Sequence, residues 1–196
     1  MREPLITFRL LLRDVTPDDA ALLQSLDADP EVMRWISGKP AETVEWHRER
    51  IRTVFVPWQT HLWHGLRVIV ERETQAFLGW VFARPAPQAW FAVPIGWSDP
   101  AEIEIGYRLA RAAWGRGIAT EAALPLVTQA LADPATQALV ACTAVGNVGS
   151  QRVLAKLGFR PVGEVALPGI DFATRKYRRE RDGQIFPASG ASSISS

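Results

Sequence analysis

The chain has 196 residues, 47% of them hydrophobic, and a formal net charge of +1. This length suits one domain with a real core, and the near-neutral charge argues against bulk binding of nucleic acid or of an anionic membrane. The only cysteine, Cys142, excludes an internal disulfide and fits a reducing compartment. We find no signal peptide and no apolar run long enough to span a membrane, so we expect a soluble, cytoplasmic protein.

The first third of the chain is predicted to form one strand followed by helices. Residues 5–12, LITFRLLL, are typical of a strand with Arg9 pointing outward. Thr16, which a proline follows, marks a helix start, and Asp29 repeats this signal for a short second helix. A third helix is expected over about residues 41–56, where the apolar positions form an imperfect stripe.

The middle of the chain changes to the period of strands. Residues 66–71 and 76–84 are predicted to form an antiparallel hairpin around a polar turn. Residues 89–97, AWFAVPIGW, are apolar but contain a proline and a glycine, which favours an irregular segment or an edge strand. Residues 102–109, EIEIGYRL, alternate cleanly and predict a strand.

The last part of the chain alternates between helices and strands. An amphipathic helix is expected to end near residue 132, and a strand is expected over 138–143. Residues 147–158, NVGSQRVLAKLG, predict a short helix that Asn147 or Ser150 caps and Gly158 ends. The stretches 159–167 and 172–181 are predicted to be the final strands.

This order of elements predicts an α+β fold with a mixed sheet covered by helices. The strands 102–109 and 138–143 are joined through a helix, so we expect them to be parallel neighbours. Without an internal repeat or a linker, residues 1–183 are predicted to be a single domain. Residues 184–196 are predicted to be a disordered tail because they are rich in serine and glycine.

The stretch WGRGIATEA, residues 114–122, places two glycines where a helix should begin. The first amides of a helix lack internal partners, and the helix dipole makes that end positive. Gly115 and Gly117 let the backbone approach an anion closely, and Arg116 adds a positive charge. The pattern therefore favours a cradle for a pyrophosphate, although a glycine turn with solvated arginines is the open alternative.

Two familiar phosphate-binding patterns do not fit this stretch. A dinucleotide-binding fold needs G-x-G-x-x-G/A, but here the small residue, Ala119, comes one place early. The strand that follows also ends without the acidic residue that binds the ribose. The P-loop pattern is absent as well, so neither type of nucleotide site is favoured.

The segments EIEIGYRLARAAWGRGIATEA and NVGSQRVLAKLGFRPVGE together resemble the two main motifs of the GCN5-related N-acetyltransferase superfamily. This resemblance covers residues 102–164. The earlier stretches LRDVTPDDAALL and DADPEVMRW are similar to the branch that holds the ribosomal-protein N-terminal (Rim-type) acetyltransferases. The resemblance implies a central mixed, mostly antiparallel sheet with a splayed parallel strand pair, and acetyl-CoA as cosubstrate without a metal.

The resemblance also assigns residues to the cosubstrate. Loop amides would bind the pyrophosphate of coenzyme A, with Trp114 standing where the family has Gln or Arg. Backbone groups of residues 105–109 would pair with the pantetheine arm, and Asn147 and Ser150 match a second coenzyme-contacting segment. The implied contacts are Ile105, Tyr107, Leu109, Trp114, Gly115, Arg116, Gly117, Ile118, Ala119, Thr120, Asn147 and Ser150.

The family reaction is direct transfer of the acetyl group to an amine, and the attacking amine must be neutral. A carboxylate can take its proton, directly or through water. Glu104 is the favoured base and Glu102 the second choice, because both lie on one face of the same predicted strand. Their like charges would raise one pKa, which suits a base. The open alternative is a solvent-facing pair, since exposed strand faces are usually polar.

The leaving thiolate needs a hydrogen-bond partner, for which Ser150 is the candidate; the alternative is that this serine caps a helix. Many family members use a tyrosine after the strand that corresponds to 138–143. This chain has none there, since its only tyrosines are Tyr107 and Tyr177. The identity of the donor therefore stays open.

Other candidate residues have ordinary explanations. Cys142 is expected in the core, where free cysteines are inert. His61 and His64 lack a third ligand in a metal-binding pattern. The basic run 175–181 is predicted to be a solvated strand face rather than a nucleic-acid site, because acidic residues dilute it.

The sequence therefore predicts an acetyl-CoA-dependent N-acetyltransferase that is a monomer or a homodimer. The acceptor is a primary amine, either a protein N-terminal α-amine or that of a small molecule. A non-catalytic acyl-CoA-binding module or sensor is the alternative. By position, the acceptor cleft is expected to include Trp35, Trp58, Trp63 and Trp97.

Overall fold

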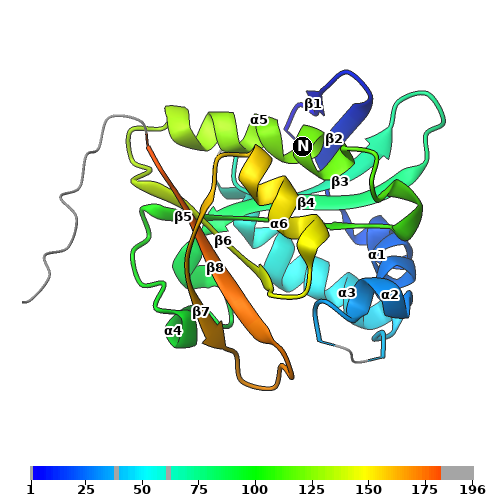
Figure 1. Ribbon diagram of the computed structural model, residues 1–196. Helices are drawn as coiled ribbons and strands as arrows, with labels where there is room; N and C mark the ends of the chain where they lie inside the picture. Colours follow the sequence, from blue (N-terminus) through cyan, green and yellow to red (C-terminus); the bar gives the residue numbers. More distant parts are fainter. Residues whose placement is uncertain (1, 38–39, 61–62, 182–196) are drawn as a thin grey trace, which may run out of the picture.

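The computed structural model describes residues 2–37, 40–60 and 63–181. In these ranges eight strands form one mixed sheet in the order β1-β2-β3-β4-β5-β6-β8-β7 (Figure 1). The strands are β1 (Leu5–Ile6), β2 (Leu10–Asp14), β3 (Gly65–Glu71), β4 (Phe77–Pro85), β5 (Glu102–Leu109), β6 (Ala138–Ala144), β7 (Arg160–Ala166) and β8 (Ala173–Glu180). The predicted α+β class is confirmed. The predicted tail, 184–196, lies outside the described residues.

Helices cover both faces of this sheet. The α-helices are α1 (Ala20–Asp27), α2 (Pro30–Met33), α3 (Val44–Arg50), α4 (Ala92–Ile95), α5 (Ile118–Ala132) and α6 (Val148–Lys156). Short turns of 3₁₀- or π-helix connect them: η1 (Pro17–Asp19), η2 (Ile51–Phe55), η3 (Pro57–Thr60), η4 (Ala86–Gln88) and η5 (Arg111–Ala113). Within the described ranges, no helix is long and apolar enough to cross a membrane.

Successive residues of the central strands bury their side chains on opposite faces. Val81 of β4 packs in one core cluster with Leu126 of α5. The next residue, Phe82, packs in a second cluster with Leu23 of α1 and Ile51 of η2. Figure 1 shows α5 and α6 on one side of the sheet and the α1–α3 group on the other. Both faces of the sheet are therefore filled.

The one parallel pair in the described part of the sheet is short. As predicted, β5 and β6 are joined through α5 and run parallel. They pair only from Glu102 opposite Ala138 to Glu104 opposite Val140. Beyond Glu104, β5 stays paired with β4 through Leu109, while β6 stays paired with β8. The two strands therefore splay apart at Glu104.

The prediction of a single strand over residues 5–12 is wrong, and residues 89–97 form an irregular segment with a short helix rather than an edge strand. Residues 5–12 form the hairpin of β1 and β2, because Thr7 donates its amide to the Leu10 carbonyl at 2.9 Å and turns the chain. Residues 89–97 contain helix α4, which Gly96 ends in the left-handed conformation at φ 80°. This segment is apolar because Ile95 and Trp97 bury against Val140 of β6 in a third core cluster.

The predicted helix over 41–56 forms in two parts. Thr43 caps α3 by accepting a hydrogen bond from the Trp46 amide at 3.2 Å. From Ile51 the helix widens into the π-helical turn η2, which ends at Phe55. Single π-turns within helices often occur at functional sites, where they shift side chains out of the regular register.

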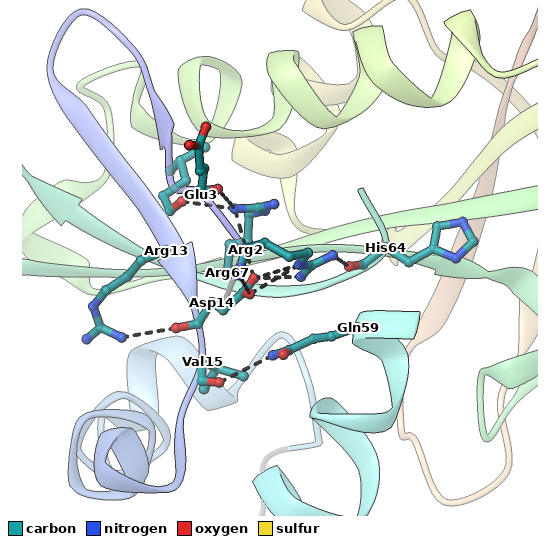
Figure 2. Close-up of polar contacts among 9 residues, drawn as sticks. Arg2, Glu3, Arg13, Asp14, Val15, Gln59, His64 and Arg67 are labelled. Carbon is teal, nitrogen blue, oxygen red and sulfur yellow. Dashed lines mark hydrogen bonds and ion pairs between the residues drawn. The ribbon is translucent and has the colours of Figure 1, made fainter. Parts of the chain in front are cut away.

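A buried arginine joins the N-terminal residues to the sheet (Figure 2). Arg67 of β3 is 2% exposed and donates to the carbonyl of Leu12, with Asp14 Oδ1 3.9 Å from its Nη1. Arg2 donates to the same carboxylate at 2.6 Å. Burial raises the pKa of Asp14, but the hydrogen bonds and charge of Arg2 outweigh this and keep it below its usual value. Removal of this carboxylate is expected to cost about 3–5 kcal/mol of folding stability, because it leaves a buried charge unpaired.

Candidate active site

The splay between β5 and β6 opens a cavity of about 990 Å³ that reaches both faces of the sheet. We divide it into two halves. The glycine-loop half is lined by Tyr107, by the loop and helix start between residues 114 and 120, and by Asn147–Ser150 of α6. The aromatic half is lined by side chains from α3, η2, η3, β4 and the opposite face of β5.

The glycine loop exposes the start of α5 to the cavity. Gly115 and Gly117 have φ values of 73° and 78°, which is the left-handed region that favours glycine. The amide of Glu121 donates to the Gly117 carbonyl at 3.1 Å as the first helical bond, so the preceding amides have no helical acceptor. The buried Thr120 Oγ1, on the cavity wall, has no hydrogen-bond partner in the described structure. These groups fit a pyrophosphate.

The side chain of Arg116 does not contribute its charge to the cavity. Its guanidinium pairs with Glu71 at the end of β3, and its side chain is 42% exposed. Its carbonyl accepts a hydrogen bond from Arg9 at 3.0 Å, and Arg9 also pairs with Glu121 of α5 at 2.7 Å. The prediction that Arg9 points outward from a strand is wrong, since it ties the β1–β2 turn to α5. Arg116 can offer only its backbone amide to a ligand.

Trp114 closes the loop against the strand before it. Its indole Nε1 donates to the carbonyl of Leu109 at 2.9 Å. Ile105, Tyr107 and Leu109 also line the cavity along the edge of β5 that β6 leaves unpaired. The Leu109 carbonyl is therefore already occupied, whereas the earlier part of this edge is available to a ligand.

A pair of hydroxyl groups connects β5 to α6 across the splay. Tyr107 OH donates to the Ser150 carbonyl at 3.1 Å and lies 3.0 Å from Ser150 Oγ. Asn147 caps α6, since its Oδ1 accepts from the Ser150 amide at 3.1 Å, so the Ser150 hydroxyl is not the cap. Burial raises the pKa of Tyr107 well above its usual value, which keeps the phenol protonated. The sequence motif did not indicate this pairing of side chains.

The two candidate glutamates have different surroundings. Glu104 is 5% exposed, lines the cavity and accepts a hydrogen bond from Arg84 Nε at 2.6 Å. Burial raises its pKa, and the charge of Arg84 opposes that rise. Glu102 pairs instead with Arg178 of β8 and does not line the cavity. The raised pKa of Glu104 therefore comes from burial and not from its neighbour on the strand.

The wall of the aromatic half comes from β4 and β5. Trp80, Phe82 and Arg84 alternate along one face of β4, and Gly106 of β5 lies opposite Phe82. The Phe82 ring covers this glycine, because a Cβ added at Gly106 would lie 2.4 Å from Phe82 Cζ. The Arg84 guanidinium lies 4.4 Å from the ring centroid of Trp58 in η3. Gly106 thus makes room for a ring on the cavity wall.

The tryptophans expected in the acceptor cleft divide between the cavity and the core. Trp35 and Trp58 line the cavity. Trp63 and Trp97 do not, because they are buried in separate core clusters at 6% exposure each. Trp114, named above as part of the glycine loop, also lines the cavity, and the sequence reasoning missed Trp46, Trp80 and Trp90.

Cys142 lies on the cavity wall and is half-buried, not enclosed in the core as expected. Burial and the negative charge of Glu104 raise the pKa of its thiol, so it stays protonated and is a poor nucleophile. His61 lies outside the described residues. Among those that are described, no group of three or more His, Cys, Asp or Glu residues could hold a metal ion.

Two of the five cations in the basic run 175–181 pair with carboxylates, and the other three donate to backbone carbonyls. Arg175 pairs with Glu164 of β7 at 2.7 Å. Arg178 pairs with Glu180 at 2.6 Å and also with Glu102. These contacts agree with the interpretation of the run as a strand face rather than a nucleic-acid site.

Comparisons with known proteins agree with this geometry. Residues 9–160 match the family model of the acetyltransferase (GNAT) domain. Over 158 residues the chain is 26% identical to the uncharacterised N-acetyltransferase YoaA of Bacillus subtilis, covering 80% of this chain and 82% of that protein. Because the family model matches most of the chain, the protein belongs to the GNAT acetyltransferase family.

Two solved structures show the same fold. RimL, a ribosomal L7/L12 α-N-protein acetyltransferase in complex with coenzyme A, superposes with a TM-score of 0.72 at 18% identity, covering 93% of this chain and 100% of that one. The aminoglycoside acetyltransferase AAC(6')-Ib with coenzyme A gives 0.68 at 19% identity, covering 88% and 95%. Membership of the GNAT family makes the protein an acetyl-CoA-dependent N-acetyltransferase, and these two structures add the likeness of fold.

Proposed function

We propose that the protein acetylates a primary amine by direct transfer, with Glu104 as the general base. One observation carries this assignment. Glu104 is a buried carboxylate on the cavity wall, at the residue where β5 and β6 stop pairing. A ligand held along the free edge of β5 reaches this carboxylate at the end of the splay. Glu102 is not part of this proposal, because Arg178 holds it outside the cavity lining.

The glycine-loop half is proposed to hold the cosubstrate. The amides of Gly117, Ile118 and Ala119 and the unpartnered hydroxyl of Thr120 bind the pyrophosphate. The free edge of β5 binds the pantetheine arm. Bound acetyl-CoA supplies an acetyl group that is activated as a thioester. The chain's own groups orient this thioester beside Glu104.

Glu104 deprotonates the attacking amine, directly or through one water. A free α-amine has a pKa near 8 and a lysine-type amine one above 10, so most of either is protonated at pH 7. A carboxylate whose pKa is raised toward neutrality is a better proton acceptor than an ordinary one. Arg84 positions the carboxylate, and its charge opposes the rise of the Glu104 pKa, which favours the ionised form.

The Ser150 hydroxyl is proposed to stabilise the leaving thiolate by a hydrogen bond. For this, Tyr107 turns its one phenol proton from the Ser150 carbonyl to Ser150 Oγ, which lies 3.0 Å away, so that the serine proton is free for the thiolate. Because the pKa of Tyr107 is raised, the phenol stays a donor throughout the neutral range. This pair is proposed in place of the family's tyrosine after β6, which the chain lacks.

The acceptor is proposed to be either a protein N-terminal α-amine, as for the Rim-type branch, or the amine of a small molecule. RimL and AAC(6')-Ib share this fold although their names give different acceptors, so the fold alone does not choose between these classes. We place the enzyme in the cytoplasm as a monomer or homodimer.

Turnover and binding measured together test the proposal. Release of coenzyme A is followed with a thiol reagent over a panel of peptides and small amines, and products are identified by mass spectrometry. Calorimetry with coenzyme A, ATP and NAD runs in parallel. We expect binding of coenzyme A alone and acetylation of at least one amine. Tight binding of acetyl-CoA with no product from any amine would instead support the sensor.

A further inference from the structure

We propose that the aromatic half selects an amine that also carries a carboxylate, and that Arg50 binds this carboxylate. The inference rests on the proposed acetyl transfer and names the chemistry of its acceptor. It starts from a cation in the cavity wall that has no anionic partner among the described residues.

Arg50 lies at the end of α3, where the chain widens into η2, and it lines the cavity. Its guanidinium lies 5.1 Å from the ring centroid of Trp46 and 5.3 Å from that of Phe55. Its guanidinium makes no hydrogen bond or salt bridge within the described ranges, and Asp27, the anion whose charge acts on it, is paired with Arg108. The aromatic rings hold the side chain in place, but the N–H groups of its guanidinium have no hydrogen-bond acceptor in the described part of the chain.

The other cations nearby are already neutralised. Arg84 pairs with Glu104 at 2.6 Å, and Arg108 pairs with Asp27 at the end of α1. Burial and the positive charges of Arg108 and Arg84 lower the pKa of Arg50. Within each of these two ion pairs the charges cancel. Arg50 therefore gives this wall one excess positive charge.

Other titratable groups on this wall do not supply the missing anion. His47 is 3% exposed, with Nε2 4.0 Å from Asp27 Oδ2, and burial lowers its pKa, so it is neutral at pH 7. Glu45 and Glu49 on α3 face solvent and pair with Arg48 and Arg52. An anion that satisfies Arg50 must therefore come with the ligand.

A continuous row of rings joins Arg50 to the proposed base. Phe55, which contacts Arg50, lies 5.1 Å from Trp58 between ring centroids. Trp58 in turn carries the Arg84 guanidinium 4.4 Å from its ring centroid, and Arg84 bonds to Glu104. This order places the amine at Glu104 and the carboxylate at Arg50, with an apolar spacer over the rings.

This arrangement disfavours a polycationic acceptor, because a second ammonium group would meet the Arg50 guanidinium. It favours acceptors that carry both an amine and a carboxylate, and two kinds of molecule meet this description. One is a free amino acid with an apolar spacer between its charged groups. The other is a peptide whose acidic side chain lies near its N-terminus. Both present a primary amine and a carboxylate on one short chain.

The test compares each acid with its own amide. Acetylation rates are measured for ω-amino acids of increasing length and for α-amino acids, each compared with its carboxamide. Short peptides with Asp or Glu near the N-terminus are compared with the same peptides carrying Asn or Gln. We expect kcat/KM to be about 10- to 100-fold higher for the best acid than for its amide, which is typical of a hydrogen bond to a charged group.

Arg50→Met should bring this ratio to about one, while affinity for coenzyme A is kept; Arg50→Lys should retain part of the preference. Arg52→Met is the matched control, since Arg52 is exposed, pairs with Glu49 and does not line the cavity. A wild-type ratio of one or less, or a ratio that Arg50→Met leaves intact, overturns the inference.

Calorimetric titration of the best-binding acid into the enzyme with coenzyme A separates this inference from the proposed function. Binding that Arg50→Met abolishes, without turnover of any amine, supports the carboxylate site and contradicts the acetyl transfer. Turnover of amines with no preference for acids supports the transfer and contradicts the site. Circular dichroism and coenzyme A affinity show that each variant is folded.

Discussion

The glycine-loop half of the cavity offers main-chain donors mainly from one continuous segment, whereas the aromatic half is built from side chains of several separate elements. In the first, the donors are amides that follow Gly115 and Gly117 and one hydroxyl, Thr120 Oγ1. In the second, Trp58 of η3 contacts Arg84 of β4, and Arg50 of α3 contacts Phe55 of η2. Main-chain donors tolerate sequence change around them, but an assembled side-chain wall changes with each substitution.

This difference suggests a division of roles. A ligand common to the whole family can be held by helix-start geometry, which depends on few side chains. The acceptor differs between relatives and has to be recognised by groups that vary. Substitutions should therefore affect either coenzyme A affinity or acceptor KM, according to the half in which they lie, and rarely both.

The largest effect is expected at the border between the halves. Glu104→Gln removes the proposed base and should lower kcat about 100- to 10,000-fold, which is typical of general base catalysis. Affinity for coenzyme A, measured by calorimetry, should stay near that of the wild type. Glu102→Gln is the matched control on the same strand, because Glu102 pairs with Arg178 and does not line the cavity. Equal losses in both variants would contradict the assignment.

The pH dependence of activity tests the same assignment of Glu104 as the base. The base acts as a carboxylate, and burial raises the pKa of Glu104 above its usual value. Activity should therefore fall as the pH drops through this raised pKa, above the range where an exposed glutamate titrates. The acid limb of kcat/KM should disappear in Glu104→Gln. A profile that is flat down to pH 4.5 in the wild type would contradict burial as the control of this base.

The second effect tests the main-chain half alone. Gly117→Val places a β-branched residue at φ 78°, which costs about 1–2 kcal/mol and shifts the amides at the start of α5. We expect coenzyme A affinity to fall about tenfold or more. Gly96→Val is the control, because it carries similar strain at φ 80° but does not line the cavity. If both variants bind coenzyme A equally well, the loop geometry is not what holds the cosubstrate.

The third effect tests the side-chain half alone. Gly106→Ala would bring a methyl group within 2.4 Å of Phe82 Cζ, so the ring must move away from the cavity wall. Overpacking of this kind costs about 1–3 kcal/mol, and we expect the acceptor KM to rise about tenfold. Coenzyme A affinity should change little. Gly106→Ala with Phe82→Leu should recover part of the loss, since the smaller side chain leaves room for the methyl group.

The sequence predicted the elements whose signals are local. Thr16 and Asp29 marked helix starts, Asn147 was named as a possible cap of α6, and the β5–β6 parallel pair followed from the helix that joins them. The glycine loop was predicted because two glycines where a helix begins let the backbone approach an anion closely. These inferences need only neighbouring residues and the rules of strand connection.

What the sequence missed depends on contacts between distant segments. Nothing in residues 5–12 marks the turn at Thr7, because each half of that stretch is a good strand. The Tyr107–Ser150 contact joins residues 43 positions apart. Gly106 looks like an ordinary strand glycine until Phe82 is placed over it. Such features follow from register and packing, which one sequence does not encode locally.

The smallest expected effect concerns the arginine that the sequence placed in the phosphate cradle. Arg116→Ala should weaken coenzyme A binding less than about threefold, because an exposed ion pair in water contributes little. The side chain pairs with Glu71, so its removal leaves the loop amides and Arg9 in place. Affinities are compared at low and high salt, where a true phosphate contact would give a steeper dependence in the wild type than in the variant. A large loss that shrinks with salt would mean that Arg116 leaves Glu71 when coenzyme A binds, and the loop would then depend on a side chain as the aromatic half does.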